Sequence, residues 1–282
     1  ITTATFYQTE EDARAAIFAA YDPLQWYGLY SNNIWSIGDI RSDDAIKGDG
    51  PPSDGLEWHQ LDNFNVLPAN FLLFEGWRAC YAGVVRANIV IEKIPEMDID
   101  EEVKKQVLGE AHFLRGLYYW NLIKFFGDVP LFEKNLSYDE SMSISRSPVA
   151  DVKELIVSEF SYASEEGRLP NTYPSSELGR VTRGAALGML SKFYLYQEQW
   201  ELAAQTAKNV IDLGVYELEA NYADNFNQEG MLNENGIESI FEVQFMSNGP
   251  TGSEWRHYNS EGTLTHVAMA PRGTGIAGME GW

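Results

Sequence analysis

The feature that most constrains the fold is a pair of short helices predicted between residues 182 and 213. Thr182 can cap a first helix that runs to Tyr196, and a second helix follows at 200–213 after a three-residue break. Gly214 then stops the second helix. Small residues on both helices let the backbones approach closely, and larger residues fill the seam. The small residues are Ala185, Ala186, Gly188, Ala203, Ala204 and Ala207, and the larger ones are Leu190, Tyr194, Trp200 and Ile211.

This helical hairpin resembles a tetratricopeptide unit of about 34 residues, a unit that stacks on its neighbours to form a solenoid. Helical periodicity also covers residues 10–27, 69–94, 101–126 and 149–166. The helix at 101–126 begins among acidic residues, and its second half is apolar on nearly every face, which indicates burial between layers. The sequence therefore predicts a mainly α fold, a scaffold of tetratricopeptide-like helical hairpins.

Two segments interrupt this pattern. Residues 39–62 are rich in glycine, proline and acidic residues, which predicts a loop and leaves Trp58 without an evident core partner. Beyond residue 214 we expect one strand at 237–245 and then an irregular loop. The expected organisation is a single domain, 1–282, with a helical scaffold at 9–214 and a loop and strand region at 215–282. The expected fold therefore combines the helical scaffold with a loop-rich, minor-β face.

The charge excludes several classes of partner. The chain has 42 acidic and 20 basic residues, a net charge of -22, whereas nucleic acids and anionic membranes need a basic surface. The acidity itself serves solubility.

A single cysteine, Cys80, lies in a helical stretch beside aromatic residues and is expected to be buried as a small hydrophobe. No run of about 18 apolar residues predicts a membrane span.

We predict no cofactor and no metal. Residues 273–278 match the dinucleotide-binding pattern GxGxxG, but Pro271 interrupts any preceding strand and we expect no helix N-terminus there to receive a pyrophosphate. The four histidines are scattered and form no HExxH pattern. The acid-rich stretches 98–102 and 224–234 do not match a calcium loop, and helix-start charge or solvation explains them better. An incidental calcium site remains the alternative for those stretches.

Catalytic residues are not indicated either. A glycosidase needs two carboxylates about 5–9 Å apart across a cleft. Among 42 acidic residues some pair always qualifies, so abundance is no evidence. No GxSxG elbow and no Cys/His arrangement supports a nucleophile. We therefore predict that the protein is not an enzyme, with an all-helical glycosidase as an alternative that requires opposed carboxylates in a deep cleft.

One segment resembles a known family. Residues 110–120, EAHFLRGLYYW, and residues 125–131, FFGDVPL, are similar to the signature helix and turn of the SusD/RagB family of outer-membrane nutrient-binding lipoproteins. Other segments follow in the family's order, at 77–88, 146–148, 179–186, 214–216 and 238–245. Relative to the family, the chain apparently lacks its C-terminal part and the anchoring N-terminal cysteine.

The resemblance implies a function in nutrient uptake. It implies a non-catalytic protein that captures an oligosaccharide at the extracellular face of a Gram-negative outer membrane and delivers it to a SusC-like TonB-dependent transporter. Contact with the membrane would be made only through an N-terminal lipid anchor that is absent from this chain. Two alternatives remain open: a member of the family that captures peptide, and a helical-repeat scaffold that binds proteins or peptides in its solenoid groove.

Two loop patches are candidate glycan sites, because sugars need exposed aromatic rings for stacking and polar side chains for hydrogen bonds. The first consists of Asp43, Asp44, Trp58, Asn63 and Asn65, and the second of Trp255, Tyr258 and Trp282. The resemblance places both regions among ligand-facing loops. For each of these aromatic residues the alternative is packing onto the scaffold. We expect the helical residues Trp77, Trp120 and Trp200 in the core.

Overall fold

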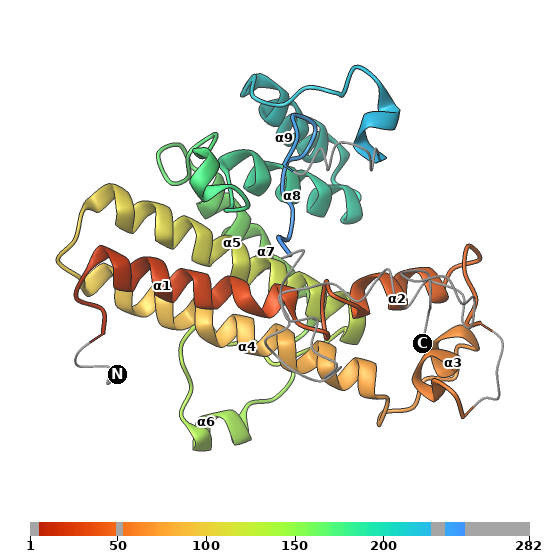
Figure 1. The fold of residues 1–282 in the computed structure, drawn as a ribbon. Coiled ribbons are helices and arrows are strands. Elements are labelled where there is room, and N and C mark those ends of the chain that lie inside the picture. The colour runs from red at the N-terminus through yellow and green to blue at the C-terminus, as the bar shows by residue number, and fades with distance from the viewer. Residues whose placement is uncertain (1–5, 49–52, 227–234, 246–282) are drawn as a thin grey trace. The chain divides into compact units, whose positions relative to one another are not determined.

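The computed structural model describes residues 6–48, 53–226 and 235–245 (Figure 1). The chain divides into two compact units. Unit 1 comprises residues 1–20 and 84–242, and unit 2 comprises residues 21–83 and 243–282. The long helix α4 (Phe71–Lys93) contributes its first part to unit 2 and its last part to unit 1.

Unit 1 contains most of the predicted helices. They are α1 (Glu10–Tyr21) up to Ala20, the end of α4, α5 (Glu101–Phe126), α6 (Tyr138–Ser143), α7 (Val149–Ser164), α8 (Arg183–Tyr196) and α9 (Trp200–Asp212), with 3-10 turns at Ile94–Glu96, Ser175–Glu177 and Tyr222–Phe226. The Asp100 carboxylate caps α5 by accepting a hydrogen bond from the Glu102 amide at 2.8 Å. At the other end, Gly127 takes φ +67°, a conformation that glycine adopts readily. These local signals explain why the helix at 101–126 was predictable.

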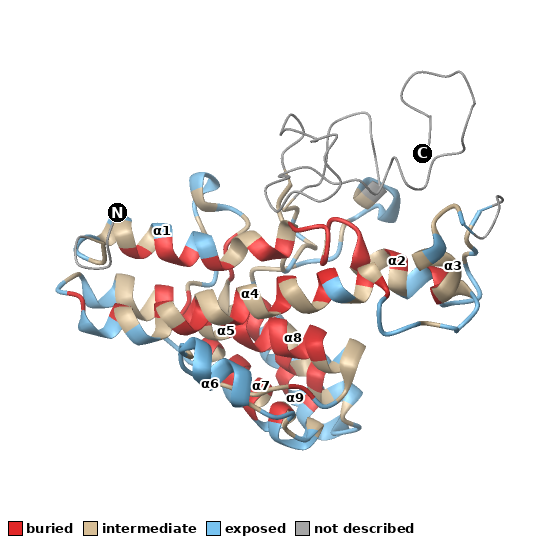
Figure 2. Ribbon diagram, turned by 90° about the horizontal axis from the view of Figure 1, so that it is seen from below, coloured by how far each residue is buried: buried red, intermediate tan, exposed pale blue. Residues whose placement is uncertain are grey.

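The helices of unit 1 pack in sequence order: α5 contacts α7, α7 contacts α8, and α8 contacts α9. Aromatic rings join these layers, since Trp120 on α5 lies 6.1 Å from Phe160 on α7 and 5.4 Å from Phe193 on α8, between ring centroids. Gly116 lets α5 and α7 come close, because a Cβ there would lie 3.0 Å from the Cβ of Glu159. Residues Phe113 to Leu122 of α5 are buried on all sides (Figure 2), as the sequence predicted.

The helical hairpin is confirmed, but several residues predicted in its seam lie elsewhere. Thr182 caps α8 by accepting from the Ala185 amide at 3.0 Å, and α9 begins at Trp200 as expected. The buried residues of the two helices include Leu190 and Phe193 on α8 and Ala203 and Val210 on α9. Trp200 and Ile211 are exposed, and so are Ala204 and Ala207, so the predicted place of these four residues in the seam was wrong. They lie on a different flank of α9 from Ala203 and Val210.

The other helical tryptophans differ from each other. Trp120 is buried, as predicted, whereas Trp77 is half-buried with its ring 4.8 Å from that of Tyr81. Cys80 is fully buried, which confirms its role as a small hydrophobe.

The helix expected at 10–27 ends early, at Tyr21, and a 3-10 turn follows at Asp22–Gln25. Pro23 has no backbone N–H and disfavours α geometry in the residue before it, which explains the early end.

Unit 2 contains α2 (Asn33–Ile40), α3 (Leu56–Asp62) and the first part of α4. The segment 39–62 was predicted to lack regular structure, and this was wrong at both ends, because α2 reaches Ile40 and α3 begins at Leu56. Gly55, with φ +70°, precedes α3 directly. Short helices of this kind are set by packing more than by periodicity, since helices of fewer than about 12 residues are marginal in isolation.

The strand expected at 237–245 is absent from the structure. Residues 237–245 form turns, a bend and extended backbone without ladder partners. In the described ranges the one β-type pairing outside the helices is an isolated bridge between Val129 and Ser147. A strand needs a partner that pairs with it along its length, whereas in the part of the chain described the neighbouring stretch contributes one backbone hydrogen bond, from the Glu217 N–H to the Ile237 carbonyl at 3.2 Å. None of the helices in that part is long and apolar enough to cross a membrane.

Candidate functional site

The core of unit 2 is a small apolar cluster. Tyr27, Ile40, Leu61 and Leu72 are buried in it, and Ile37, Trp58, Val66 and Phe71 pack against it. Burial, together with the negative charges of Glu57 and Glu75, raises the pKa of Tyr27, so its hydroxyl stays neutral. This cluster holds α2, α3 and the start of α4 together, and it supports the loops that carry the first predicted patch.

Trp58 is part of that support. It lies on α3 and packs against the apolar cluster, although the sequence left it without an evident core partner. A Cβ on Gly55 would lie 3.0 Å from the Trp58 ring, so the turn before α3 is closely fitted to the indole. The partner residues come from positions 27, 40 and 72, far from Trp58 in the sequence, which is why local patterns did not reveal them.

Phe64 is an exposed aromatic residue of the same region. It follows α3 in a turn, takes φ +54°, and is 66% exposed. The guanidinium carbon of Arg41 lies 4.8 Å from the centre of the Phe64 ring, a cation–π contact. Sequence reasoning missed both residues. An available signal was the run Asn63-Phe64-Asn65, where a large apolar side chain stands between two asparagines in a break of helical periodicity.

Four of the predicted site residues flank this contact. Asp43 and Asp44 are exposed and follow Arg41 closely in the chain, while Asn63 and Asn65 are exposed on either side of Phe64. The Asn63 amide donates to the His59 carbonyl at 2.9 Å, and the Asp44 backbone N–H donates to the Ser42 hydroxyl at 3.1 Å. The Arg41–Phe64 contact therefore joins two segments that the sequence had proposed as parts of one patch.

We call this group of residues the Phe64 platform: Arg41, Asp43, Asp44, Asn63, Phe64 and Asn65. It combines an exposed ring, which can stack on the C–H face of a sugar, with carboxylates, amides and a guanidinium that can bond to hydroxyl groups. The second predicted patch, Trp255, Tyr258 and Trp282, lies outside the described residues.

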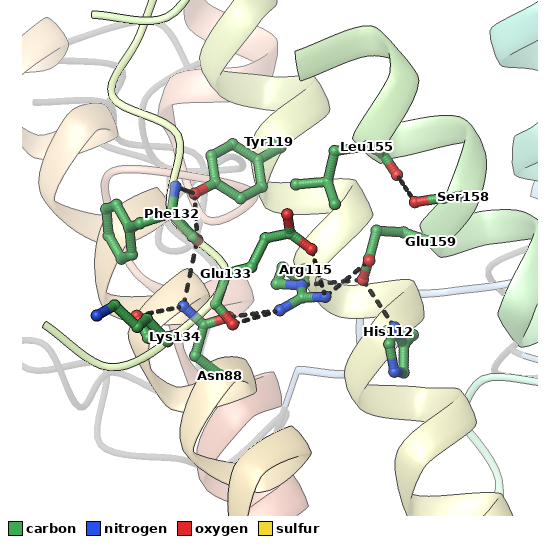
Figure 3. A network of polar contacts seen from close by, with 10 residues as sticks. All are labelled: Asn88, His112, Arg115, Tyr119, Phe132, Glu133, Lys134, Leu155, Ser158 and Glu159. Carbon is green, nitrogen blue, oxygen red and sulfur yellow. Dashed lines mark hydrogen bonds and ion pairs between the residues drawn. The ribbon is translucent and has the colours of Figure 1, made fainter. Parts of the chain in front are cut away.

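The signature helix α5 carries a different polar arrangement, inside unit 1 (Figure 3). Arg115 donates to both carboxylate oxygens of Glu159, at 3.0 and 2.8 Å, and to the side-chain oxygen of Asn88 at 2.7 Å. His112 contacts the same carboxylate at 3.1 Å. Burial alone would raise the pKa of Glu159, but the hydrogen bonds from His112 and Arg115 outweigh it and hold that pKa below its usual value.

This network is closed and does not resemble a hydrolytic site. Glu159 is fully occupied by Arg115 and His112, and a second carboxylate, that of Glu133, also lies 3.9 Å from Arg115. The Arg115 guanidinium thus pairs with both carboxylates of this network, and two-carboxylate hydrolysis needs carboxylates that are free to act on a substrate. Glu110, one further polar residue of α5, forms a second buried ion pair with Arg180. The polar residues of the signature therefore serve the interior of the helical scaffold.

A family model described as "Starch-binding associating with outer membrane", SusD-like, matches residues 27–195. The matched part contains the signature helix, the Phe64 platform and the first helix of the hairpin. The chain belongs to the SusD-like family.

Relatives agree with this assignment. The chain is 26% identical to SusD-like protein P25 of Formosa agariphila over 268 residues, 92% of this chain and 48% of that protein. A solved laminarin binding SusD-like protein is 30% identical, with a TM-score of 0.86 over 95% of this chain and 58% of that one. Surface glycan-binding protein A from Bacteroides thetaiotaomicron, solved in complex with laminarihexaose, is 27% identical with a TM-score of 0.80, over 95% of this chain and 57% of that one.

The chain spans about half the length of the relatives it matches. Membership in the SusD-like family confirms the resemblance found in residues 110–131 and the mainly helical, tetratricopeptide-like fold. The names of the relatives connect this family with glycan binding at the cell surface.

Proposed function

We propose that this SusD-like chain binds an oligosaccharide through the Phe64 platform of unit 2 and that it is not an enzyme. The observation that carries the proposal is the exposed Phe64 ring with Arg41 against it. Exposed Asn63 and Asn65 adjoin Phe64 in the chain, and exposed Asp43 follows Arg41 by two residues. Shallow aromatic platforms with a polar rim suit neutral sugars, which need stacking and hydrogen bonds but no buried charge. The acidic surface of the chain is compatible with a neutral ligand.

The site is proposed to act in nutrient uptake. In this proposal the full-length protein is lipid-anchored at the extracellular face of the outer membrane and passes the glycan to a SusC-like TonB-dependent transporter. Family membership supports this proposal. Laminarin-type glycans are the first ligands to test, because two of the similar solved structures carry laminarin or laminarihexaose in their names.

The test is isothermal titration of the chain with laminarihexaose, a malto-oligosaccharide and a panel of other plant, host and microbial oligosaccharides. We expect Phe64→Ala to raise Kd for the bound glycan about tenfold, because loss of one stacking ring removes about 1.5 kcal/mol. Phe74→Ala is the matched control, since Phe74 is 58% exposed and also lies beside an arginine, Arg78, at 5.6 Å. Its Kd should stay within about twofold of wild type.

Two outcomes would contradict the proposal. Equal losses in Phe64→Ala and Phe74→Ala would show that binding does not depend on the platform. If the wild-type chain bound none of the oligosaccharides in the panel, the result would count against glycan capture and would favour a peptide ligand or a protein-binding scaffold.

Trp58→Ala is expected to affect stability more than binding. Removing an indole that packs against the apolar cluster should lower the free energy of unfolding by about 1–3 kcal/mol, while the folded fraction keeps its glycan affinity. Thermal unfolding and titration at a temperature where the variant is folded measure the two effects. Trp200→Ala, which removes an exposed indole, should change stability by less than about 0.5 kcal/mol. Unchanged stability with lost binding would instead place Trp58 in the ligand site.

A further inference from the structure

Phe64 occupies a backbone position that disfavours a large side chain. It is the second residue after α3, and its φ of +54° lies in the left-handed region, where a bulky residue is strained. The Phe64 N–H donates to the Leu61 carbonyl at 3.1 Å. The next N–H, that of Asn65, donates to the Gln60 carbonyl at 3.0 Å. These two bonds form a Schellman motif, in which the left-handed residue is usually glycine.

Other helices of the chain end at a left-handed residue that carries no exposed ring. Gly214 holds the corresponding position after α9, with φ +66°, and Glu198 holds it after α8, with φ +58°. Glu198 also stands in a Schellman motif, because the N–H of Gln199 donates to the Tyr194 carbonyl at 3.0 Å. Its charged side chain is well solvated there, whereas the Phe64 ring is 66% exposed. A strained backbone that places an apolar ring in water points to use of that ring by a ligand.

Strain of this kind persists only where surrounding contacts fix the backbone. The connection 63–70 joins α3 to α4, and six of its eight residues are exposed. Val66 is half-buried and packs against the apolar cluster of unit 2. Asn70, at the end of the connection, is only 2% exposed. Val66 and Asn70 are therefore the side chains that anchor this turn in the interior.

Asn70 ties the end of the turn back to α3. Its amide group donates to the Glu57 carbonyl at 3.1 Å and to the Gln60 side-chain oxygen at 2.9 Å. Its side-chain oxygen accepts from the Leu72 N–H at 3.0 Å, so Asn70 also caps the start of α4. Gln60 is the shared point, because its backbone carbonyl accepts from the Asn65 N–H near the start of the turn. Both ends of the turn are thus bonded to one residue of α3.

We propose that Asn70 is a positioning residue of the Phe64 platform. Asn70 is buried and touches no ligand, and it holds the turn 63–70 in the strained form that presents the Phe64 ring beside Arg41. A ring that is already in place loses less conformational freedom when a sugar stacks on it. The identity of the ligand as a glycan rests on the proposed function, whereas the hold of Asn70 on the ring does not.

The variant Asn70→Ser separates the bonds to α3 from the cap of α4. A serine hydroxyl still caps a helix, but it is one atom too short to replace the amide that reaches Glu57 and Gln60. We expect Kd for laminarihexaose, or for the oligosaccharide of the panel that wild type binds, to rise about fivefold, because binding must now order the ring. Isothermal titration is carried out at a temperature where circular dichroism shows the variant folded.

A double-mutant cycle shows whether Asn70 acts through Phe64. In a Phe64→Ala background, Asn70→Ser should change Kd by less than about twofold, because no ring is left to position. Asn88→Ser is the matched control in unit 1. Asn88 is also buried and its amide also holds a connection, through the Phe132 and Lys134 carbonyls, so this variant should lose stability but keep Kd within about twofold.

A fluorine label reports the position of the ring without any glycan. With 4-fluorophenylalanine at position 64, we expect Asn70→Ser to move the fluorine NMR signal toward that of the urea-unfolded chain, and Asn88→Ser to leave it in place. If Asn70→Ser does not fold, Gln60→Ala takes its place in every arm, since it removes one of the bonds from Asn70 to α3.

The strain itself is measured by thermal unfolding. Phe64→Gly should melt about 2 °C above Phe64→Ala, because both lack the ring but only glycine relieves the left-handed backbone. Glu198→Gly should exceed Glu198→Ala by a similar margin. Equal melting temperatures of the two variants at position 64 would mean that there is no strained turn for Asn70 to hold, and would overturn the proposal.

The remaining outcomes separate this inference from the proposed function. An unchanged fluorine signal in Asn70→Ser, or a rise in Kd that persists in the Phe64→Ala background, would overturn the positioning role and leave glycan binding by the Phe64 platform in place. If the wild-type chain bound no oligosaccharide, the proposed function would fall instead. The fluorine signal would then decide by itself whether Asn70 holds the ring.

Discussion

Glu159→Ala is expected to lower the free energy of unfolding by about 3–5 kcal/mol. The variant leaves Arg115 with its charge buried and its main partner removed, and breaking a buried ion pair from one side has an effect of that size. His112 loses its hydrogen-bond partner in the same step. Urea unfolding followed by circular dichroism measures the change.

The control for this prediction lies on α7, the helix that carries Glu159. Glu154 is exposed on α7, so Glu154→Ala should change the free energy of unfolding by less than about 0.5 kcal/mol. A Glu159→Ala variant as stable as Glu154→Ala would mean that the network contributes nothing to the fold.

The Glu159 carboxylate also makes part of the free energy of unfolding dependent on pH. Because the pKa of Glu159 is lower in the folded chain than its value of about 4.3 in an unfolded one, its ionised form stabilises the fold above about pH 4.3. That contribution is lost as the pH falls through the folded pKa. The difference in stability between wild type and Glu159→Gln should therefore be constant near neutral pH and shrink below about pH 4. A difference that instead grew in acid would contradict the lowered pKa.

Gly28→Ala is expected to lower the free energy of unfolding by about 2–3 kcal/mol. A Cβ at this position would lie 2.5 Å from the carbonyl carbon of Glu75 and closer still to its oxygen, and these are backbone atoms of α4 that cannot rotate away. Nearby, the Asn33 side chain donates to the Leu72 carbonyl, so the loop and the helix are held together at this point. Thermal unfolding measures the loss.

Gly38→Ala is the opposite case and serves as control. Gly38 lies inside α2, and a methyl group added there would have nothing within 4 Å, so alanine should be neutral or should stabilise the chain by up to about 1 kcal/mol. If both glycine variants behaved alike, the close approach of Gly28 to α4 would not be a constraint on the fold.

Local signals in the sequence determined the long helices and the family. The helix at 101–126 was predictable because Asp100, Gly127 and a continuous apolar face are all encoded within it or beside it. The hairpin at 182–213 was predictable for the same reason, from Thr182 and Gly214. Residues 110–131 carried the SusD-like resemblance directly, and with it the expectation of glycan binding.

Only the tertiary structure decided which side chains are available. Trp58 packs against partners from positions 27, 40 and 72, whereas Phe64 is left in solvent by the turn after α3. Both look alike in the sequence, as aromatic residues in a region rich in polar residues. Likewise Trp200 is exposed because it begins α9 on a flank away from α8. Residues 237–245 form no strand because, in the described part of the chain, the stretch at Glu217 gives them one backbone hydrogen bond and no ladder. Helix periodicity and caps act within about one turn, whereas burial depends on contacts between distant segments, which no local pattern records.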